Sequence, residues 1–301
     1  MMTTDYHIPV MLNECIDALN ISPDGFYVDA TYGGGGHSAA ILDKLNSGKL
    51  YAFDQDEDVH DRVPDDERLV FIDHNFQYIK NFLKFYDAIP VDGILADLGV
   101  SSHQFDTAER GFSFRFDADL DMRMNQDQDL TAKDVVNSYS EQDLTNILKQ
   151  YGEFRRAYPL AKKIVQRRQS AAINTTAELK EIATPFLERN HHSKGLAQIF
   201  QAIRIEVNAE MKALEEFLLG AVDVLKPGGR LVVMTYHSLE DRLVKNLILK
   251  GSLTGEVEKD LYGNVIKPLE AVQRKPILAS DEEMESNPRA RSAKLRIAEK
   301  I

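Results

Sequence analysis

Short apolar runs that end in an acidic residue recur in the first part of the chain. Residues 26–30 form one such run, and residues 50–53 form another that ends at Asp54. Between them lie a glycine-rich turn and a segment of helical character, residues 39–45. This order of strand, turn, helix and strand is typical of a βαβ unit, so the sequence predicts a parallel sheet.

Later parts of the chain extend the predicted sheet. The segment that starts at Met211 and ends at Leu225 repeats apolar side chains at spacings of three and four, which predicts an amphipathic helix. A Lys-Pro-Gly-Gly-Arg turn follows this helix. Further apolar runs predict strands at residues 69–72, 91–97, 231–234, 271–273 and 294–297.

More than 100 residues separate the strands predicted at 91–97 and 231–234, which is too many for one crossover. Few β-rich runs occur there, and three capping signatures predict helix starts. These are Thr131 with Asp134, Ser140 with Asp143, and Thr175 with Glu178. The predicted fold is therefore α/β, with a mostly parallel, Rossmann-like sheet domain (residues 1–105 and 200–301) and an inserted helical domain (residues 106–199).

Composition limits the function classes. The 301 residues carry 48 acidic and 36 basic side chains, so a net charge of −12 excludes nucleic-acid binding by bulk attraction and leaves only local basic patches. Cys15 is the single cysteine, which excludes an internal disulfide and a cysteine-based zinc site, and no metal site is predicted. No run approaches the roughly 18 apolar residues that a membrane span needs, so a soluble, cytoplasmic protein without membrane contact is expected.

The predicted strand ends define a candidate cofactor site. Ligands of open parallel sheets bind beyond the carboxyl ends of the strands, where the acids Asp29, Asp54 and Asp97 and the glycines Gly33, Gly34, Gly35 and Gly36 are expected. Asp54 follows Gly36 by 18 residues, a position from which an acid bonds a ribose diol. The site residues could also be only a turn and solvated strand ends, but the combination argues for a ligand.

Two cofactors fit this pattern. The spacing of Gly34, Gly36 and Ala39 satisfies the dinucleotide pattern G-x-G-x-x-A, which leaves a nicotinamide enzyme as an alternative. His37, however, stands where a pyrophosphate needs access to the helix start. S-adenosylmethionine has no phosphate and carries a positive sulfonium, which suits three strand-end acids better, and the set resembles class I S-adenosylmethionine-dependent methyltransferases.

A more specific resemblance covers nearly the whole chain. It is similar to the MraW family of small-subunit ribosomal RNA methyltransferases, and the matching residues are 7–12 (HIPVML), 95–106 (LADLGVSSHQFD), 109–114 (ERGFSF), 120–124 (LDMRM), 200–208 (FQAIRIEVN), 226–230 (KPGGR), 237–242 (HSLEDR) and 287–292 (NPRARS). The resemblance implies S-adenosylmethionine-dependent methylation of N4 of one cytidine in 16S rRNA of the small ribosomal subunit. It also raises the expectation of a homodimer.

The resemblance also assigns cofactor contacts. They fall on Gly35, Gly36, His37, Asp54, Phe76, Asp97 and Gln104. Two segments depart from the family pattern. His103 stands where the family often has proline, and residues 191–194 lack the usual His-Pro-Ala sequence, so no family role transfers to them.

Methylation of an exocyclic amine needs an acceptor for the N4 hydrogen. The candidates are Asp97, a neighbouring carbonyl and the Ser102 hydroxyl, and Asp97 has the alternative role of holding the cofactor's amino group. His237, after the fifth predicted strand, is a candidate to touch the base or relay the proton, and a structural role is weighed equally. Residues 99–103 lack the second glycine of a hydrolase nucleophile elbow, and one cysteine excludes a zinc deaminase.

Local basic residues are candidates for contacting RNA phosphates, with a solvated helix face as the alternative interpretation. Phe112, Phe114 and Phe116 alternate with Arg115, which suits base stacking but is more typical of core positions. A nicotinamide oxidoreductase and a non-catalytic RNA-binding assembly factor remain the alternative functions. The RNA-contact candidates are Arg110, Arg123, Arg155, Arg156, Lys162, Lys163, Arg167 and Arg168.

Overall fold

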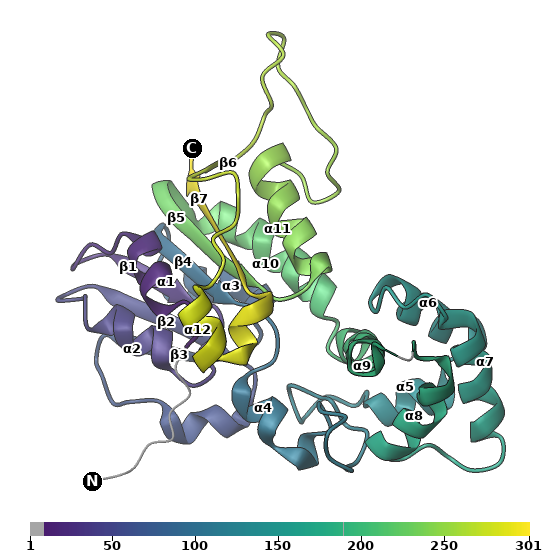
Figure 1. Ribbon diagram of the computed structural model, residues 1–301. Helices are drawn as coiled ribbons and strands as arrows, with labels where there is room; N and C mark the ends of the chain where they lie inside the picture. Colours follow the sequence, from purple (N-terminus) through teal and green to yellow (C-terminus); the bar gives the residue numbers. More distant parts are fainter. Residues whose placement is uncertain (1–8, 189) are drawn as a thin grey trace. The chain divides into compact units, whose positions relative to one another are not determined.

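The chain forms two compact units (Figure 1) in a computed structural model that describes residues 9–188 and 190–301. Unit 1 comprises Met1–Gly99 and Met211–Ile301, and unit 2 comprises Val100–Glu210. The predicted inserted domain, residues 106–199, lies inside unit 2. Unit 2 extends further because helix α9 (His192–Val207) contributes buried side chains to its core along most of its length.

A seven-stranded sheet forms the centre of unit 1. The strand order is β3-β2-β1-β4-β5-β7-β6, in which neighbours are parallel from β3 to β5 and β7 is antiparallel to both β5 and β6. This confirms the predicted Rossmann-like, mostly parallel sheet. The strands are β1 (Phe26–Asp29), β2 (Lys49–Asp54), β3 (Leu69–Asp73), β4 (Val91–Asp97), β5 (Leu225–Thr235), β6 (Leu269–Ala271) and β7 (Lys294–Lys300).

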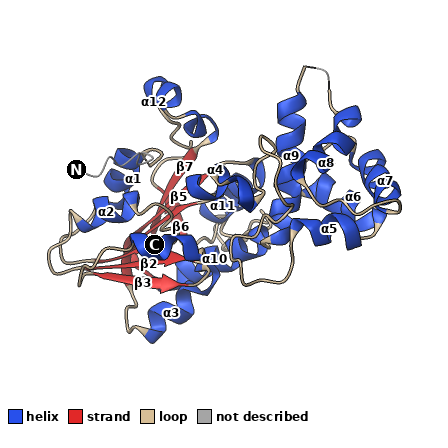
Figure 2. Cartoon of the chain, turned by 90° about the horizontal axis from the view of Figure 1, so that it is seen from below, coloured by secondary structure: helices blue, strands red, loops and turns tan. Residues whose placement is uncertain are grey.

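Helices cover both faces of this sheet (Figure 2). Alternate residues of the central strands point to opposite faces, so Ile94 and Leu231 pack into one buried cluster while Leu95 and Val232 pack into another. The first cluster includes α3 (Ile79–Phe85), α10 (Glu210–Val224) and α11 (Ser238–Lys250). The second includes α1 (Leu12–Leu19), α2 (Gly36–Leu42) and α12 (Asp281–Ser286).

Several element bounds differ from the sequence-based prediction. Residues 226–229, expected as a turn before a strand, lie within β5, because Leu225 pairs with Val91 and pairing resumes at Arg230 opposite Gly93. The intervening residues form a bulge with Gly228 at φ +77°. Strand β6 ends at Ala271, two residues before the predicted end at 273, and helix α2 begins at Gly36 rather than at 39.

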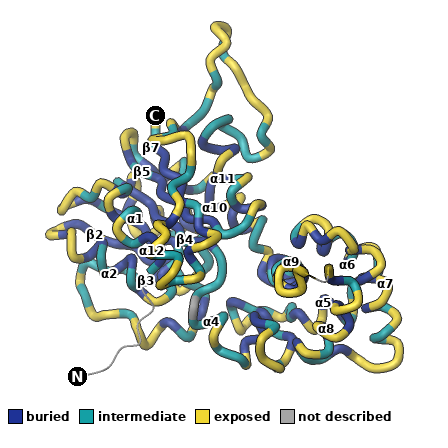
Figure 3. The backbone as a smooth tube through the Cα atoms, in the orientation of Figure 1, coloured by how far each residue is buried: buried dark blue, intermediate teal, exposed yellow. Residues whose placement is uncertain are grey.

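The chain between α11 and β6, residues 251–268, forms an arm that projects from unit 1 (Figure 1). A bridge between Lys259 and Val265 joins its two sides. The arm is exposed over most of its length (Figure 3), and Leu261 and Tyr262 at its tip are almost fully accessible to solvent.

Unit 2 is helical and has its own buried core, as the sequence predicts for the insert. The side chains of Thr131, Ser140 and Thr175 cap helices as expected, each accepting from the backbone N–H three residues on. In the described part of the chain, no helix combines the length and apolar character that a membrane crossing requires. The remaining helices of unit 2 are α4 (Ser102–Asp106), α5 (Ala132–Ser138), α6 (Glu141–Gln150), α7 (Ala157–Arg168) and α8 (Thr176–Ala183).

Candidate active site

Three acidic residues end neighbouring strands at one edge of the sheet. Asp29 ends β1, Asp54 ends β2 and Asp97 ends β4. Strand β1 pairs with β2 on one side and with β4 on the other, so the chain order reverses at β1. Such a topological switch point is where open α/β sheets bind their ligands. The structure therefore brings together the three carboxyl groups that the sequence predicts at strand ends.

The glycine-rich turn after β1 has one open position and two crowded ones. A Cβ atom added at Gly34 would meet no other atom within 4 Å, so this backbone borders open space. A Cβ at Gly35 would approach the Tyr32 hydroxyl to 2.7 Å, and one at Gly36 would collide with the Pro9 ring. Gly33 and Gly35 also have positive φ angles of 52° and 76°, which side chains other than glycine rarely adopt.

Asp54 holds this turn through its carboxylate. Its Oδ2 accepts a hydrogen bond from the Gly33 N–H at 2.8 Å, and its Oδ1 accepts one from the Asp56 N–H at 3.0 Å. Burial raises the pKa of Asp54 to about 6, although these backbone hydrogen bonds oppose the shift. The carboxylate therefore connects the end of β2 to the glycine turn, which is the position expected for an acid that bonds a ribose diol.

Asp97 lies within a network of polar groups from three segments of the chain. The Tyr236 hydroxyl donates to its Oδ1 at 2.7 Å, and its backbone N–H donates to Thr31 Oγ1 at 2.7 Å. Its Oδ2 lies 4.0 Å from His37 Nδ1. Burial raises the pKa of Asp97 to about 6, while His37 and the Tyr236 hydrogen bond partly oppose the shift. Burial and Asp97 raise the pKa of Tyr236 well above its ordinary value, so the phenol keeps its proton and acts as a donor.

His37 and Asp29 are buried residues close to Asp97. The His37 side chain is only 6% exposed, and its Nε2 lies 3.2 Å from the Val10 carbonyl oxygen. Asp29 is fully buried and accepts hydrogen bonds from the Ser38 hydroxyl at 2.7 Å and the Thr31 N–H at 3.1 Å. Asp29 therefore acts on the turn after β1 rather than facing a ligand.

Tyr236 and Thr31 are site residues that sequence reasoning missed. Both contact Asp97 from segments far away along the chain, since Tyr236 follows β5 and Thr31 follows β1. The signal available for Tyr236 was an aromatic side chain directly after β5. This strand neighbours β4, which ends at Asp97. Nothing in the local pattern marks Thr31.

The other predicted site residues of unit 1 have clear structural contacts. His237 is the N-cap of α11, with Nδ1 accepting from the Glu240 N–H at 3.4 Å and Nε2 lying 3.1 Å from Glu240 Oε1. Phe76 packs edge-on against Phe217 at 5.1 Å between ring centroids. A catalytic role for His237 and a cofactor contact for Phe76 therefore stay predictions.

Two predicted site residues belong to the first helix of unit 2. Gln104 is buried and completes a capping box, in which its Oε1 accepts from the Ser101 N–H at 3.1 Å and its N–H donates to Ser101 Oγ at 3.1 Å. Ser102 begins α4, but its side chain lies outside the described part of the structure. Both predicted roles stay predictions.

The candidate RNA-contact residues fall into two groups. Arg110 is 7% exposed, and its guanidinium donates to the carbonyl oxygens of Arg123 and Met124. Arg123 forms a two-bond ion pair with Asp121 and also donates to two carbonyl oxygens. These two arginines hold a loop of unit 2, and no phosphate contact is needed to explain them.

The basic residues around α7 are more accessible. Arg155, Arg156, Lys162 and Lys163 are exposed, whereas Arg167 and Arg168 are half-buried and donate to nearby backbone carbonyl oxygens.

The three alternating phenylalanines are divided between core and surface. Phe112 is buried and Phe114 packs on Phe200 at 5.6 Å between ring centroids, so both belong to the core of unit 2. Phe116 is the exposed member of the series. Base stacking by all three is therefore not compatible with their positions.

The residues present fit S-adenosylmethionine better than a dinucleotide. Open space beside Gly34 and the Asp54 carboxylate can receive an adenosyl ribose, which bonds carboxylate oxygens through its hydroxyls. A pyrophosphate requires a free helix start, but Pro9 fills the space at Gly36 and the buried His37 ring occupies the first turn of α2. This arrangement argues against the nicotinamide alternative.

Two solved structures are similar at low identity. They are an rRNA methylase from Streptococcus thermophilus (TM-score 0.41, 13% identity, 98% of this chain and 99% of that chain) and the N-methyltransferase NodS from Bradyrhizobium japonicum (TM-score 0.41, 7% identity, 96% and 93%). Neither likeness supports a functional inference.

Sequence comparisons identify the family. The MraW methylase family matches residues 4–301. The chain is 56% identical over 300 residues to a protein of Flavobacterium johnsoniae, covering 99% of both chains, and 55% identical over 296 residues to one of Phocaeicola vulgatus, covering 98% and 97%. Both relatives are named ribosomal RNA small subunit methyltransferase H. The chain therefore belongs to the MraW methylase family, and S-adenosylmethionine is its cofactor.

Proposed function

We propose that the protein transfers the methyl group of S-adenosylmethionine to N4 of a cytidine in 16S rRNA of the small ribosomal subunit. The single observation that carries this proposal is the family match over residues 4–301, combined with relatives above 50% identity that are named small-subunit rRNA methyltransferases. The strand-end positions of Asp54 and Asp97 and the free space beside Gly34 support it independently.

The cofactor is assigned to the turn after β1 and the end of β2. Asp54 would accept hydrogen bonds from the ribose hydroxyls, and the backbone of Gly33 and Gly34 would border the bound molecule. When bound, S-adenosylmethionine supplies an electrophilic methyl carbon on a positively charged sulfur. The family resemblance adds Gly35, Gly36, His37, Phe76 and Gln104 as further cofactor contacts.

Asp97 is assigned as the acceptor for the N4 hydrogen. The N4 lone pair is delocalised into the cytosine ring, and a carboxylate that accepts an N4 hydrogen makes this nitrogen a better nucleophile. Methylation leaves N4 with one surplus proton, which the carboxylate then takes. Tyr236 holds Oδ1, while Oδ2 has His37 Nδ1 at 4.0 Å as its neighbour. A pKa near 6 keeps Asp97 ionised at neutral pH while making it a stronger base than an ordinary aspartate.

Ser102 and His237 are the other candidates for the reacting nitrogen. His237 already caps α11 and lies beside Glu240, so we assign it a positioning role at the start of that helix.

The exposed basic residues Arg155, Lys162 and Lys163 are assigned to RNA phosphates, and Arg156 is a further candidate for contacting the RNA. An assembled small subunit as the form of the substrate, a homodimeric enzyme and a cytoplasmic location all remain predictions from the resemblance and the proposed substrate. A nicotinamide oxidoreductase has no support from the family match, and neither has a non-catalytic assembly factor.

Labelled methyl transfer tests the function. Purified protein is incubated with small subunits that lack the modification and with labelled S-adenosylmethionine, and nucleosides are analysed by mass spectrometry. We expect N4-methylcytidine in 16S rRNA. A methyl group on another atom of the base, or no transfer with the cofactor bound, would overturn the proposal.

Asp97→Asn tests the acceptor. We expect kcat to fall by about 10²–10⁴-fold, the usual contribution of a positioned proton acceptor, with Kd for S-adenosylmethionine changed less than threefold. Asp65→Asn, an exposed aspartate of unit 1, is the matched control and should leave both values unchanged. A near-normal kcat in Asp97→Asn would remove the acceptor role, and a large loss of cofactor affinity would support the alternative that Asp97 holds the cofactor's amino group.

A further inference from the structure

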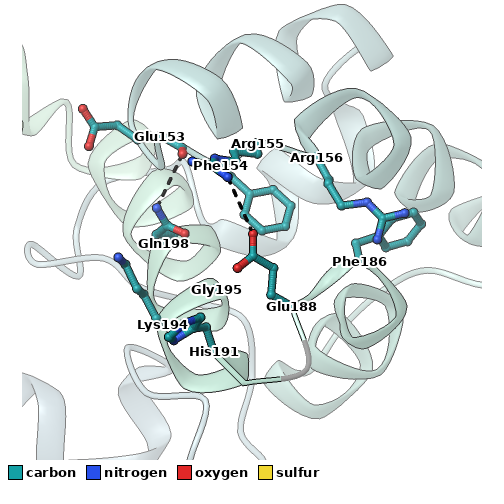
Figure 4. A pocket seen from close by; sticks show the side chains of 10 residues that line it. All are labelled: Glu153, Phe154, Arg155, Arg156, Phe186, Glu188, His191, Lys194, Gly195 and Gln198. Carbon is teal, nitrogen blue, oxygen red and sulfur yellow. Dashed lines mark hydrogen bonds and ion pairs between the residues drawn. The ribbon is translucent and has the colours of Figure 1, made fainter.

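Unit 2 contains a pocket that the proposed chemistry does not use (Figure 4). Its volume is about 240 Å³, and it lies among the segment before α7, the segment after α8 and the first turns of α9. This is slightly below the roughly 300 Å³ at which pockets for drug-sized ligands begin, so a group the size of one nucleotide base fits better than a larger ligand. All of its lining residues belong to unit 2.

One wall is a cation stacked on an aromatic ring. The guanidinium carbon of Arg156 lies 5.4 Å from the centroid of the Phe186 ring, and Arg156 Nη1 donates to the Pro185 carbonyl oxygen at 3.5 Å. Figure 4 shows the guanidinium lying against the ring. A guanidinium held flat in this way presents a plane on which an unpaired RNA base stacks.

The opposite side supplies one positive charge, that of Lys194. Lys194 and His191 are exposed, and Figure 4 shows them across the pocket from Arg156 and Phe186. Among the residues that the structure describes, no carboxylate forms an ion pair with Lys194. A flexible lysine ammonium with no internal partner is suited to a phosphate, which it meets as a point charge.

Arg155 is a further cation at the pocket, and it forms only a weak ion pair. The Arg155 side chain is 90% exposed, and its Nη1 lies 4.0 Å from Glu188 Oε1. Exposed ion pairs at this distance contribute little, whereas a phosphate can accept two parallel hydrogen bonds from one guanidinium. In Figure 4 the carboxylate of Glu153 points away from the pocket, whereas that of Glu188 lies within it, so a bound phosphate replaces Glu188 as the partner of Arg155.

We propose that this pocket binds one unpaired nucleotide of the substrate RNA. The base stacks on the Arg156–Phe186 pair, and its phosphate is bound by Arg155 and Lys194 at the rim. This inference rests on the proposed function, because it assigns part of the same RNA substrate to a separate site. Residues 191–194 depart from the family's His-Pro-Ala pattern, so the pocket is argued from this chain's own residues.

A binding experiment separates stacking from charge. An unstructured, fluorescently labelled oligoribonucleotide and inorganic polyphosphate are titrated against the protein at several salt concentrations. Phe186→Leu should raise the Kd for the oligoribonucleotide by about tenfold, which is the scale of one lost base stack. It should leave the Kd for polyphosphate unchanged. Lys194→Gln should weaken the binding of both ligands. For the oligoribonucleotide, it should also reduce the slope of log K against log salt concentration by about 0.7, the value for one lost single-strand phosphate contact.

Lys133→Gln is the matched control, because Lys133 is an exposed lysine of unit 2 outside the pocket. It should leave both affinities unchanged. Arg156→Gln gives a second test of stacking if Phe186→Leu lowers the Tm. The proposal is overturned if Phe186→Leu and Arg156→Gln, both folded, bind the oligoribonucleotide like the wild type. It is also overturned if Lys194→Gln behaves like Lys133→Gln.

A methyl-transfer assay then distinguishes a failure of the pocket proposal from a failure of the proposed function. With small subunits as substrate, Lys194→Gln and Phe186→Leu should raise KM by three- to tenfold, while kcat and the Tm shift induced by S-adenosylmethionine stay at wild-type values. If the wild type methylates and these variants have a wild-type KM, the pocket proposal fails and the proposed function stands. If the wild type binds the oligoribonucleotide through this pocket but does not methylate, the proposed function fails.

Discussion

At the scale of single residues, two glycines of the turn after β1 have different reasons to be glycine. Gly34 borders open space, so Gly34→Ala should leave the Tm of the free protein within about a degree. The added methyl should occupy cofactor space and weaken S-adenosylmethionine binding by about tenfold or more. Gly36→Ala would instead collide with Pro9, so it should destabilise the free protein by about 1–3 kcal/mol. Thermal melts and calorimetric titration with the cofactor measure both effects.

The two variants serve as controls for each other. If Gly34→Ala binds S-adenosylmethionine like the wild type, the cofactor does not lie beside this backbone. If Gly36→Ala is as stable as the wild type, the Pro9 segment moves readily, and the argument against a pyrophosphate at the start of α2 is lost.

The raised pKa values of two strand-end carboxyl groups predict a pH dependence of cofactor binding. Asp54 and Asp97 each have a pKa raised to about 6, above the value of about 3.9 in an unfolded chain. The folded protein therefore binds more protons than the unfolded chain between pH 4 and 6, so these groups cost stability above pH 6 and this cost is relieved as pH falls. Cofactor binding has the opposite dependence, because the ribose hydroxyls need the ionised Asp54 as acceptor.

We therefore expect the Tm shift induced by saturating S-adenosylmethionine to shrink between pH 7 and pH 5. In Asp54→Asn the shift should be smaller at pH 7 and nearly flat over this range. A shift that is equally large at pH 5 and pH 7 in the wild type would contradict an ionised Asp54 as the ribose ligand.

The sequence predicted the positions of those candidate site residues that directly follow a strand. Asp54 and Asp97 were expected at strand ends, where they lie, because an acid at the end of a buried strand is a local pattern. The hydrogen bond from Tyr236 to Asp97 spans 139 residues and the one from Asp97 to Thr31 spans 66, so both depend on the finished sheet. Burial of Arg110, which the sequence suggested as an RNA contact, likewise follows only from the folded loop.

At the scale of elements, local signals predicted helix starts better than strand details. The caps at Thr131 and Thr175 were found because the side chain and its backbone partner are three residues apart. The bulge of β5 was mistaken for a turn before the strand, because Pro227 and Gly228 favour turns and only pairing of Leu225 with Val91 extends the strand. The predicted insert, residues 106–199, is shorter than unit 2, because the apolar pattern of α9 does not reveal which buried core this helix joins.

The end of helix α11 gives an element-scale prediction. Gly251 is its C-cap, with φ +75°, and a Cβ there would collide with the carbonyl oxygen of Ile266. Gly228 has a similar φ of +77° but open space around it. Gly228→Ala should cost about 1 kcal/mol from backbone strain alone, and Gly251→Ala should cost about 2–4 kcal/mol because the clash adds to the strain.

Both glycines lie in unit 1, so their Tm values report on the same core and can be compared directly. The Tm of Gly251→Ala should fall clearly below that of Gly228→Ala. Equal Tm values would mean that the last part of the arm, around Ile266, moves aside from the helix end without cost.

At the scale of the whole molecule, the two units have separate buried cores. One cluster contains only residues of unit 2, while the clusters around the sheet contain only residues of unit 1. The residues assigned to the ribose and the methyl-accepting nitrogen, Asp54 and Asp97, belong to unit 1. A ligand stabilises only the part of a protein whose folding its binding requires.

Calorimetry should therefore resolve two unfolding transitions, and S-adenosylmethionine should raise that of unit 1 more than that of unit 2, to which only Gln104 among its assigned contacts belongs. Leu160 is fully buried in the core of unit 2, so Leu160→Ala should lower the free energy of unfolding of unit 2 by about 2–5 kcal/mol. Ile94→Val, in the core of unit 1, should lower the cofactor-sensitive transition by about 0.5–1.5 kcal/mol. A single transition that shifts as a whole with the cofactor and with both variants would mean that the units fold as one cooperative body.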